Sequence, residues 1–563
     1  MRLYPISLLL LFINSLWSQA EYPKDAFRPP LDIPLILAGT FGELRSNHFH
    51  SGIDIKTQQR QGLPVYAIAD GTVTRIKVSL WGYGKALYLA HPDGHTSVYA
   101  HLQKFSPQIE AYIKRLQYER RSFEVEVFPD FGELSVKKED LIAYSGNTGG
   151  SSGPHLHFEI RNSISEKPVN PLLYGFEVRD ATSPILQELY VYPLSAEAQV
   201  NQSREKIQLS FTRQTDGTYL ADKVSALGSI GFGVVSYDRQ DLAANKNGVF
   251  SVKQIVNGKV YSEFDFESFS FKETRYINTL IDYEHFSSSR KRIQRCFKVS
   301  GNKLGIYNKL FNDGKIIVNE GMSYKVRIEI ADLHGNTTTL NIPVEGHREE
   351  IRNKSINRTT NRLLIAQRPN NYKLGNATVY FPANTFYEDF YIDLNQQSDT
   401  LKIHDNSIPA HRKFTVSFDV SRFTRDERSQ MFIARLDKHL KPNYMSTYKR
   451  DSNFSTRTRS LGTYTLARDT TAPKIRAKNF KNKQWLTNYR YLSLHISDDL
   501  SGVNTYNASL NGEWILMEYE PKTSTLTYNF DDKILDRKQC ELKVTVTDNV
   551  GNTTTFESSF YRN

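Results

Sequence analysis

The histidines of this chain are concentrated in one stretch. Seven of the 14 histidines of the 563-residue chain lie between residues 48 and 157, and five of these seven fall in clusters at 48–54, 98–102 and 153–159. Between the clusters the sequence consists of short strand-like runs and Gly turns. The sequence therefore predicts a small β domain that gathers several imidazoles.

The third cluster has a direct physical interpretation. Because side chains at i and i+2 of a strand share a face, His155 and His157 point the same way while Leu156 and Phe158 face the core. Two imidazoles on one face suit zinc, or one zinc ligand beside one acid or base. By itself, such a pair is more often a surface or packed feature.

The first cluster adds a carboxylate, in the pattern His50-x-x-x-Asp54. We expect Gly52 to let the backbone bend so that the imidazole and the carboxylate converge. Two His and one Asp leave the fourth tetrahedral position for water, which is the open arrangement of a catalytic zinc, whereas a structural site would close it. His48, two residues before His50, is interpreted as a residue at the rim.

Local patterns predict the elements between the clusters. Residues 64–69 and 72–76, separated by Asp70-Gly71, indicate a hairpin, and residues 85–91 and 96–101 indicate a second one. A helix is predicted after Ser106, because Pro at its first position and apolar residues on one face follow that residue. His91 and His95 flank a turn and are expected to be exposed.

After Arg179 the chain changes to alternating strands framed by two repeated phrases. An opening phrase, Asp-x-Thr-x-Pro, occurs at 180–184 and 469–473, and a closing phrase, Asp-x-x-Gly-Asn, at 332–336 and 548–552. This framing looks like immunoglobulin-like sandwich modules. Residues 346–468 share the strand character without the closing phrase, so they are predicted only to be β-rich.

The ordered motifs of the first part resemble the lysostaphin-type zinc metallopeptidases, which cut peptide crosslinks in bacterial cell walls. The resemblance runs from Asn47 to Pro171 and rests on the motifs His50-Ser51-Gly52-Ile53-Asp54, Gly62 to Val73, Tyr99-Ala100-His101-Leu102 and Ser145-Gly146-Asn147-Thr148-Gly149 leading into Gly153 to Glu159. It implies that His50, Asp54 and His157 hold one Zn²⁺ per chain. It also implies that His101 and His155 are the catalytic histidines.

The predicted fold class is mainly β. The resemblance implies a small antiparallel β-sheet peptidase domain with a duplicated hybrid motif, followed by two or three β-sandwich, immunoglobulin-like domains. The expected divisions are a signal peptide at 1–20, an extended lead-in at 21–40, the zinc metallopeptidase domain at 41–178, β-sandwich domains at 179–345 and 469–563, and a β-rich domain at 346–468.

Two assignments stay open at this point. An unligated His can take a proton from water and deliver it to the leaving amine while another stabilises the oxyanion, but the sequence does not say which of His101 and His155 does which. Glu159 follows His157 on the same strand face. It is either a support for that ligand or a solvated strand charge.

The N-terminus predicts export. A single Arg, an apolar run from Ile6 to Leu16 and the exit Ser18-Gln19-Ala20 are the parts of a secretory signal peptide. No later segment is long and apolar enough to span a bilayer. We expect an exported protein of the bacterial periplasm or cell envelope, or a secreted one. Cys296 and Cys540 are expected to remain unpaired thiols.

The net charge is distributed unevenly between the histidine-bearing part of the chain and the β-rich remainder. Residues 21–178 are close to neutral, and the formal net charge of +11 falls in residues 179–563. A basic β-rich region can hold an anionic wall or envelope polymer, although a mixed surface with a modest Lys excess explains the charge equally well. Nucleic acid is excluded as a partner because export removes the protein from it and no recognition motif occurs.

The leading interpretation is therefore an exported zinc endopeptidase that acts on peptidoglycan stem peptides. One alternative is a non-catalytic regulator of other wall hydrolases, and another is a wall-binding adhesin that works through the β-sandwich modules. The stretch between His101 and Ser145 is longer than a compact member of the family needs. We expect this insertion to form a wall or lid of the substrate groove.

Overall fold

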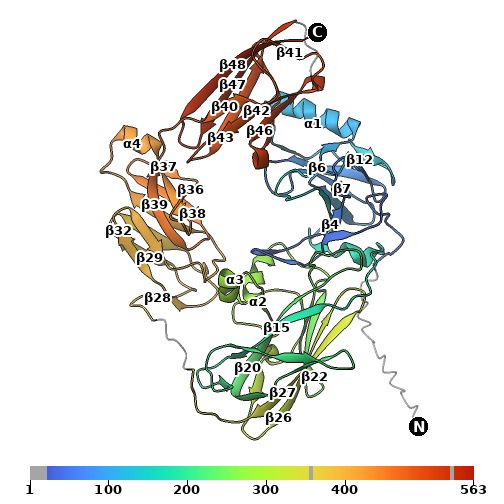
Figure 1. The fold of residues 1–563 in the computed structure, drawn as a ribbon, viewed down its shortest axis with the longest axis vertical. Coiled ribbons are helices and arrows are strands. Elements are labelled where there is room, and N and C mark those ends of the chain that lie inside the picture. Colours follow the sequence, from blue (N-terminus) through green and yellow to red (C-terminus); the bar gives the residue numbers. More distant parts are fainter. Residues whose placement is uncertain (1–21, 354–358, 533–537, 563) are drawn as a thin grey trace, which may run out of the picture.

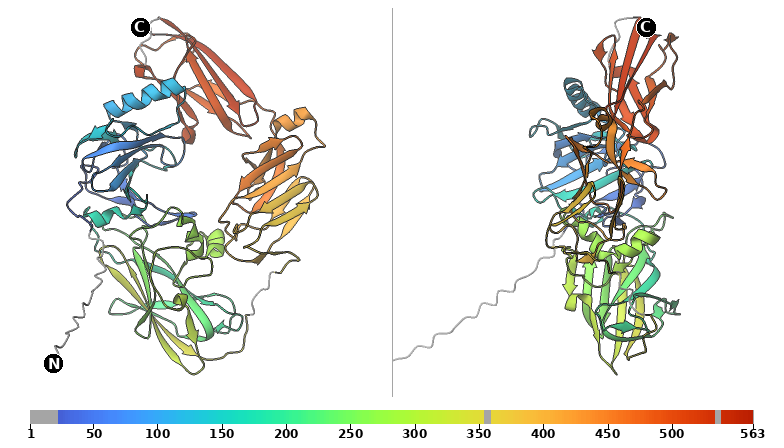
Figure 2. Two further views of the ribbon diagram at one scale, coloured as in Figure 1. Left: turned by 180° about the vertical axis from the view of Figure 1, so that it is seen from behind. Right: turned by 90° about the vertical axis from the view of Figure 1, so that its left-hand side faces the viewer.

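A computed structural model describes residues 22–353, 359–532 and 538–562. The predicted signal peptide, residues 1–20, lies outside them. Within the described ranges the chain forms four β-rich units, here numbered in chain order: 22–178, 179–346, 359–468 and 469–562. Figures 1 and 2 show the units following one another around a ring, with the fourth returning to the first. The mainly β prediction is confirmed.

The first unit is built on an antiparallel sheet in the order β1-β4-β13-β8-β7-β6-β10, beside a smaller sheet β5-β12-β9. Its elements are β1 (Leu37–Gly39), β2 (Leu44–Arg45), β3 (His48–Phe49), β4 (Ile53–Lys56), β5 (Pro64–Tyr66), β6 (Gly71–Val78), β7 (Lys85–Ala90), β8 (His95–Ala100), β9 (Lys104–Phe105), α1 (Pro107–Arg120), β10 (Val125–Val127), β11 (Ser135–Val136), β12 (Leu141–Tyr144), β13 (His155–Asn162), β14 (Pro168–Val169) and the 3-10 helix η1 (Pro171–Tyr174).

Strand β13 occupies the centre of this sheet. Its His157 pairs with Asp54 on β4 and with Ala100 on β8, directly before His101. Leu156 is fully buried, as the alternation predicted. The register therefore brings all three histidine clusters to one place.

One of the two predicted hairpins is present. Strands β7 and β8 pair as expected, but β5 pairs with β12 rather than with β6, so the first hairpin prediction is wrong. The reason lies in the residues that follow β5. Ala67 N donates to Asp140 O at 2.9 Å, so the residues after β5 remain hydrogen-bonded to the β12 segment. They therefore do not form a tight turn that pairs β5 with β6.

The predicted helix is α1. It begins after Ser106 with Pro in its first turn, and it buries Ile109, Ile113 and Gln117 against the unit. It ends at Arg121, which has left-handed backbone angles that stop the helical hydrogen bonding.

The second unit is organised around one long strand. Its elements are β15 (Ile185–Pro193), β16 (Gln199–Val200), β17 (Ile207–Leu209), β18 (Phe211–Arg213), β19 (Tyr219–Ala221), β20 (Val224–Tyr237), β21 (Ser251–Val256), β22 (Lys259–Asp265), η2 (Thr274–Tyr276), α2 (Ile277–Leu280), α3 (Tyr283–Ser289), β23 (Gln294–Arg295), β24 (Tyr307–Leu310), η3 (Asn312–Gly314), β25 (Ile316–Val318), β26 (Ser323–Ala331) and β27 (Thr337–Gly346). Strand β20 pairs with β15 along one half and with β27 along the other, so it links the two parts of the sheet.

The cores of the first and second units are continuous. Phe41 and Phe49 of the first unit stack on Phe269 of the second with ring centroids 5.1 and 5.3 Å apart, and Phe49 also contacts Phe266 at 5.4 Å. Aromatic packing of this kind carries large apolar areas across the junction. The strand that leads to His50 is therefore anchored on the second unit.

The third unit is a sandwich of two sheets, ordered β29-β30-β34-β38-β37 and β32-β33-β39-β35-β36, with a hydrophobic core between them. Its elements are β28 (Leu363–Leu364), β29 (Asn370–Leu374), β30 (Ala377–Phe381), β31 (Phe390–Tyr391), β32 (Leu394–Gln397), β33 (Thr400–Ile403), β34 (Phe414–Asp419), α4 (Arg425–Gln430), β35 (Met431–Leu436), β36 (Pro442–Tyr444), β37 (Tyr448–Arg450), β38 (Asn453–Thr458) and β39 (Gly462–Arg468). The prediction of a β-rich domain here is confirmed.

The fourth unit is also a two-sheet sandwich, ordered β40-β42-β46-β45 and β41-β48-β47-β43-β44. Its elements are β40 (Lys474–Ala477), β41 (Gln484–Trp485), β42 (Tyr491–Ser497), β43 (Val503–Leu510), β44 (Glu513–Trp514), β45 (Glu518–Glu520), η4 (Pro521–Thr523), β46 (Thr525–Asn529), η5 (Phe530–Asp532), β47 (Gln539–Asp548) and β48 (Thr553–Tyr561). Cys540 lies in its core and Cys296 in the core of the second unit, and no disulfide joins these two described residues.

The opening and closing phrases of each unit lie against each other in the structure. In the second unit, Asn336 of the closing phrase donates from Nδ2 to the carbonyl of Asp180 in the opening phrase at 3.2 Å. In the fourth unit, Asn552 donates to the carbonyl of Asp469, again at 3.2 Å. The two phrases thus close the same end of each unit, while the immunoglobulin-like topology stays a prediction.

No helix in the described ranges has the length and apolar character that a membrane-spanning segment needs.

Candidate metal centre

The three predicted metal ligands form one buried cluster. His50 Nε2 lies 3.0 Å from Asp54 Oδ1 and 3.0 Å from His157 Nδ1, and His157 Nδ1 lies 2.8 Å from the same carboxylate oxygen. The side chains are between 2% and 7% exposed. Strand β4 supplies the carboxylate, β13 supplies one imidazole, and the turn before β4 supplies the other.

Hydrogen bonds fix the orientation of both imidazoles. His50 Nδ1 lies 2.7 Å from Thr40 O, and His157 Nε2 lies 2.8 Å from Glu159 Oε1. Since these oxygens only accept, each of those nitrogens carries the proton. The lone pairs of His50 Nε2 and His157 Nδ1 are left facing Asp54.

These donor atoms fit a zinc ion. Two imidazole nitrogens and one carboxylate oxygen converge, and each ring is held through its other nitrogen, as ligating histidines usually are. Three protein ligands leave room for water or substrate. His50, Asp54 and His157 are therefore the residues that could hold the metal.

The carboxylate of Asp54 is ionised. Burial opposes the charge, but the neighbouring imidazoles of His50, His155 and His157 hold the pKa of Asp54 well below its usual range. Its second oxygen accepts from Arg45 Nη2 at 2.6 Å. Sequence reasoning missed Arg45 because no spacing relates it to the histidine clusters.

Glu159 supports His157 rather than forming a solvated strand charge. It is fully buried, and besides His157 it accepts from Arg161 Nε at 2.6 Å, from Ser51 Oγ at 2.7 Å and from the Tyr83 hydroxyl. Although burial opposes its charge, Arg161 and His157 lower the pKa of Glu159, so it is a carboxylate. Of the two alternatives open from sequence, the structure supports the first.

Gly52 has a different role from the predicted bend. Its backbone is outside the left-handed region, and a Cβ added there would lie 2.2 Å from the carbonyl oxygen of Phe158. The segment before β4 therefore requires glycine in order to pack against β13. Close approach of two backbones, rather than a sharp turn, brings His50 toward His157.

The two predicted catalytic histidines lie beside the cluster. His101 Nδ1 is 2.9 Å from Thr148 O and His155 Nδ1 is 2.8 Å from Gly153 O, so both rings keep Nε2 available. Their ring centroids are 4.8 Å apart, and His155 Nε2 lies 3.5 Å from Asp54 Oδ1. His101 has a φ of 58°, a left-handed conformation that non-glycine residues rarely adopt.

The environment keeps His101 neutral. Burial and the neighbouring His157 and His155 lower the pKa of His101 to about 3. At neutral pH the ring is therefore uncharged, with a free lone pair on Nε2.

The other histidines of the first unit do not join the cluster. His48 is exposed and bonds through Nδ1 to Ser46 O at 2.8 Å, as a rim residue would. The prediction that His91 is exposed is wrong. His91 is buried because its ring bridges Asp70 O and Ser97 Oγ, both at 2.8 Å, and so ties the turn before β6 to β8.

The fourth unit contacts the loop that holds the two predicted catalytic histidines. Lys522 Nζ donates to Ser151 O at 3.1 Å and to Asn147 O. Between these carbonyls lies Thr148, which accepts from His101, and Ser151 Oγ is 3.2 Å from His155 Nδ1. No sequence pattern pointed to this contact, because its two sides are far apart in the chain.

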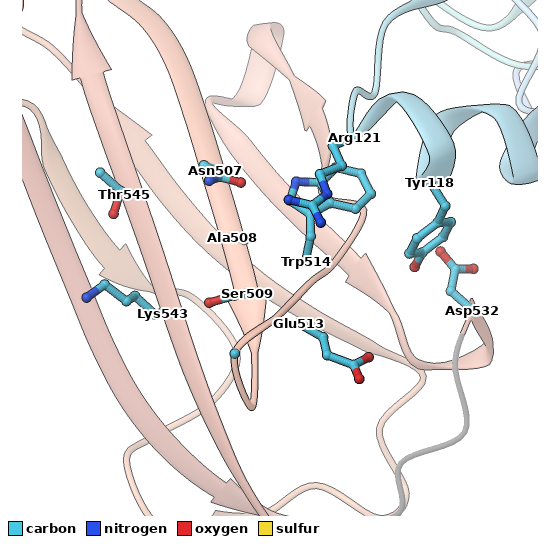
Figure 3. A pocket seen from close by; sticks show the side chains of 11 residues that line it. Tyr118, Arg121, Asn507, Ala508, Ser509, Glu513, Trp514, Asp532, Lys543 and Thr545 are labelled. Carbon is cyan, nitrogen blue, oxygen red and sulfur yellow. The ribbon is translucent and has the colours of Figure 1, made fainter.

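Helix α1 also faces the fourth unit. The Tyr118 ring packs edge-on against Trp514 at 5.3 Å, and Lys114 forms an ion pair with Asp532. Figure 3 shows Tyr118 and Asp532 next to each other, at the edge of a cavity of about 950 Å³ between α1 and the fourth unit. The structure thus places α1 of the insertion against the fourth unit, and its role as a wall or lid of the substrate groove stays a prediction.

Comparison with known families agrees with the resemblance seen in the sequence. Residues 48–118 and 132–171 match the family model described as peptidase family M23, and residues 361–469 match a Zu5-like domain. The interval 119–131 that the peptidase match omits lies within the predicted insertion.

Several curated proteins are similar to part of this chain. The DD-carboxypeptidase/endopeptidase Mpg of Neisseria meningitidis is 36% identical over 139 residues, which cover 25% of this chain and 26% of Mpg. The murein hydrolase activator NlpD of Salmonella typhimurium is 34% identical over 161 residues, which cover 29% of this chain and 34% of NlpD. The chain thus matches only about a quarter to a third of the length of these relatives.

Solved structures are similar over the same region. The catalytic domain of lysostaphin from Staphylococcus simulans is 27% identical and has a TM-score of 0.19, with 25% of this chain and 93% of that chain covered. A zinc-containing peptidase from Vibrio cholerae is also 27% identical, with a TM-score of 0.18, and 27% of this chain and 38% of that chain are covered.

Replacing Glu159 should weaken metal binding. Glu159→Gln removes the charge that orients the His157 ring, so we expect zinc affinity to fall by roughly 10- to 100-fold. Competition with a chromophoric zinc chelator measures this change. Glu166→Gln is the matched control, because Glu166 pairs with the same Arg161 at 3.2 Å but is 57% exposed. Equal zinc affinity of Glu159→Gln and the unchanged chain would contradict the role of Glu159.

Proposed function

We propose that this chain, which contains a lysostaphin-type peptidase M23 domain, is an exported zinc endopeptidase that hydrolyses peptide crosslinks of bacterial peptidoglycan. The observation that carries the proposal is the open donor set of His50, Asp54 and His157, with two further imidazoles that present Nε2 beside it. The open donor set suits catalysis, because a purely structural zinc site closes its coordination with a fourth protein ligand.

The substrate is proposed from the relatives. Mpg is described as a DD-carboxypeptidase/endopeptidase and is 36% identical over the matched region. We therefore favour direct crosslinks between stem peptides over glycine bridges. Action at such crosslinks places the protein in the periplasm or cell envelope.

The chain's own residues divide the proton transfers. Bound zinc would supply Lewis acidity, which polarises a carbonyl and lowers the pKa of water. His101, neutral and with Nε2 available, takes the proton of the attacking water and passes it to the leaving amine. His155 is the second imidazole beside the ligands, with Nε2 3.5 Å from Asp54 Oδ1, and it stabilises the oxyanion on the attacked carbonyl in the form that carries a proton on Nε2.

A regulator of other wall hydrolases is the second candidate, and the similarity to the activator NlpD favours it. The complete set of three ligands and two flanking imidazoles supports the enzyme instead, since a purely regulatory domain needs none of them. The basic region that includes the Zu5-like domain would hold the protein in the envelope by binding an anionic envelope polymer.

Removing His101 should abolish cleavage while zinc stays bound. His101→Ala removes the proposed base without removing a ligand, so we expect a loss of roughly 10²- to 10⁴-fold in the rate of muropeptide crosslink cleavage. Mass spectrometry of digests of defined muropeptides measures the rate, and metal analysis should give about one zinc per chain.

His347→Ala is the control for this variant, since His347 is 68% exposed and lies just after the second unit. If His101→Ala cleaves as fast as the unchanged chain, the catalytic assignment fails. If the zinc-loaded chain cleaves no muropeptide but stimulates another wall hydrolase, the regulatory candidate replaces the enzyme.

The contact made by Lys522 should set the catalytic rate. Lys522→Ala releases the loop that positions His101 and His155, and losing a charged hydrogen bond of about 1.5 kcal/mol corresponds to roughly a tenfold lower kcat. Zinc content and KM should stay unchanged. Lys543→Ala, which removes a 58% exposed lysine of the same unit, is the control. A higher kcat would show that the contact restrains the enzyme and would overturn this expectation.

A further inference from the structure

Three buried carboxylates meet where the opening and closing phrases close the second unit. Asp180 belongs to the opening phrase, Asp332 to the closing phrase, and Asp238 directly follows β20. Asp238 and Asp332 are 3% and 5% exposed, and the side chain of Asp180 is 1% exposed. Gathering three acidic groups away from water is costly unless a positive charge is present.

The local charges are poorly balanced by the protein itself. Burial and the neighbouring Asp180 and Asp332 raise the pKa of Asp238 to about 7. His334 lies close, with Nδ1 4.0 Å from Asp180 Oδ2, but its side chain is 34% exposed and at the edge of the group. The carboxylates therefore repel one another in the absence of a cation.

Unpartnered oxygens point to a ligand at the same place. Within the described residues, Asp238 Oδ1 and the amide oxygen Gln240 Oε1 are buried without a hydrogen-bond partner, and Gln240 is 5% exposed. Buried polar atoms are normally satisfied. Both side chains line a cavity of about 30 Å³ together with Asp180 and Asp332, and such a volume holds one ion.

We propose that Asp180, Asp238, Asp332 and Gln240 form a binding site for a divalent cation, Ca²⁺. All four contribute oxygen atoms, and three of them are carboxylates, which is the donor set of a hard cation. The group lies apart from the zinc ligands His50, Asp54 and His157. The cation would join the opening phrase, the end of β20 and the closing phrase.

The site also lies against the first unit. Thr40 and Gly248 line the same cavity, and Gly248 N donates to Thr40 Oγ1 at 3.0 Å. The carbonyl of Thr40 accepts from His50 Nδ1 at 2.7 Å. A cation here would stiffen the segment that orients one of the zinc ligands.

The fourth unit repeats the arrangement. Asp469 of its opening phrase, Asp548 of its closing phrase and Asp498 after β42 place ligand atoms within 4.8 Å of one another. Asp498 Oδ1 and Ser501 Oγ are buried without a partner among the described residues. The same three positions are thus acidic in both units that carry the two phrases.

Calcium binding by the full-length, zinc-loaded chain tests the proposal. Isothermal titration with CaCl₂ and metal analysis after gel filtration give the number of bound Ca²⁺ ions. We expect Asp238→Asn to bind one Ca²⁺ fewer per chain than the unchanged protein, and to lose part of the rise in Tm that CaCl₂ causes. Asp222→Asn, which changes the charge equally at an exposed position of the same unit, should behave as the unchanged chain.

A second variant guards against misfolding. Gln240→Leu removes the amide oxygen without adding charge, and circular dichroism establishes that each variant is folded. The Ca²⁺ affinity of Gln240→Leu should fall at least tenfold, while its zinc content stays at the level of the unchanged chain. The proposal is overturned if the unchanged chain binds no Ca²⁺ at millimolar concentration, or if folded Asp238→Asn and Gln240→Leu bind as much Ca²⁺ as it does.

Discussion

The register of β13 between β4 and β8 is the constraint on which the site depends. It sets His157 opposite Asp54 on one side and next to the start of the His101 turn on the other. Because side chains alternate along a strand, a slip of one residue would turn Leu156 and Phe158 toward the metal position and bury the imidazoles in the core. The buried apolar side chains of β13 therefore hold the ligands in place as much as their hydrogen bonds do.

The grouping of His50, Asp54 and His157 could be predicted from sequence because it depends on local patterns. A His-x-His strand and a His-x-x-x-Asp turn each specify a geometry within a few residues, and α1 carried its own start signal at Ser106. Of the groups that orient these side chains, only Glu159 was a candidate from sequence. Thr40 and Thr148 act through backbone carbonyls, which leave no trace in residue type. The predicted hairpin at 64–76 is absent for a related reason, because β5 pairs with β12, which is distant in sequence.

The β units act on the peptidase domain from two sides. The second unit shares its hydrophobic core with the first and holds Thr40 through Gly248, close to His50. The fourth unit holds the loop around Thr148 through Lys522, close to His101 and His155. The basic region thus has a structural role at the site in addition to any attraction for polymer.

The contact between Lys522 and Ser151 spans 371 residues of sequence. Closing so large a loop costs entropy before the contact returns any energy, so this part of the structure forms late in folding. Chains that are still being synthesised, or that have been shortened from the C-terminus, contain the whole histidine cluster but lack the lysine that fixes its loop. Because the fourth unit returns to the first, the site reaches its final arrangement only after the whole chain has folded.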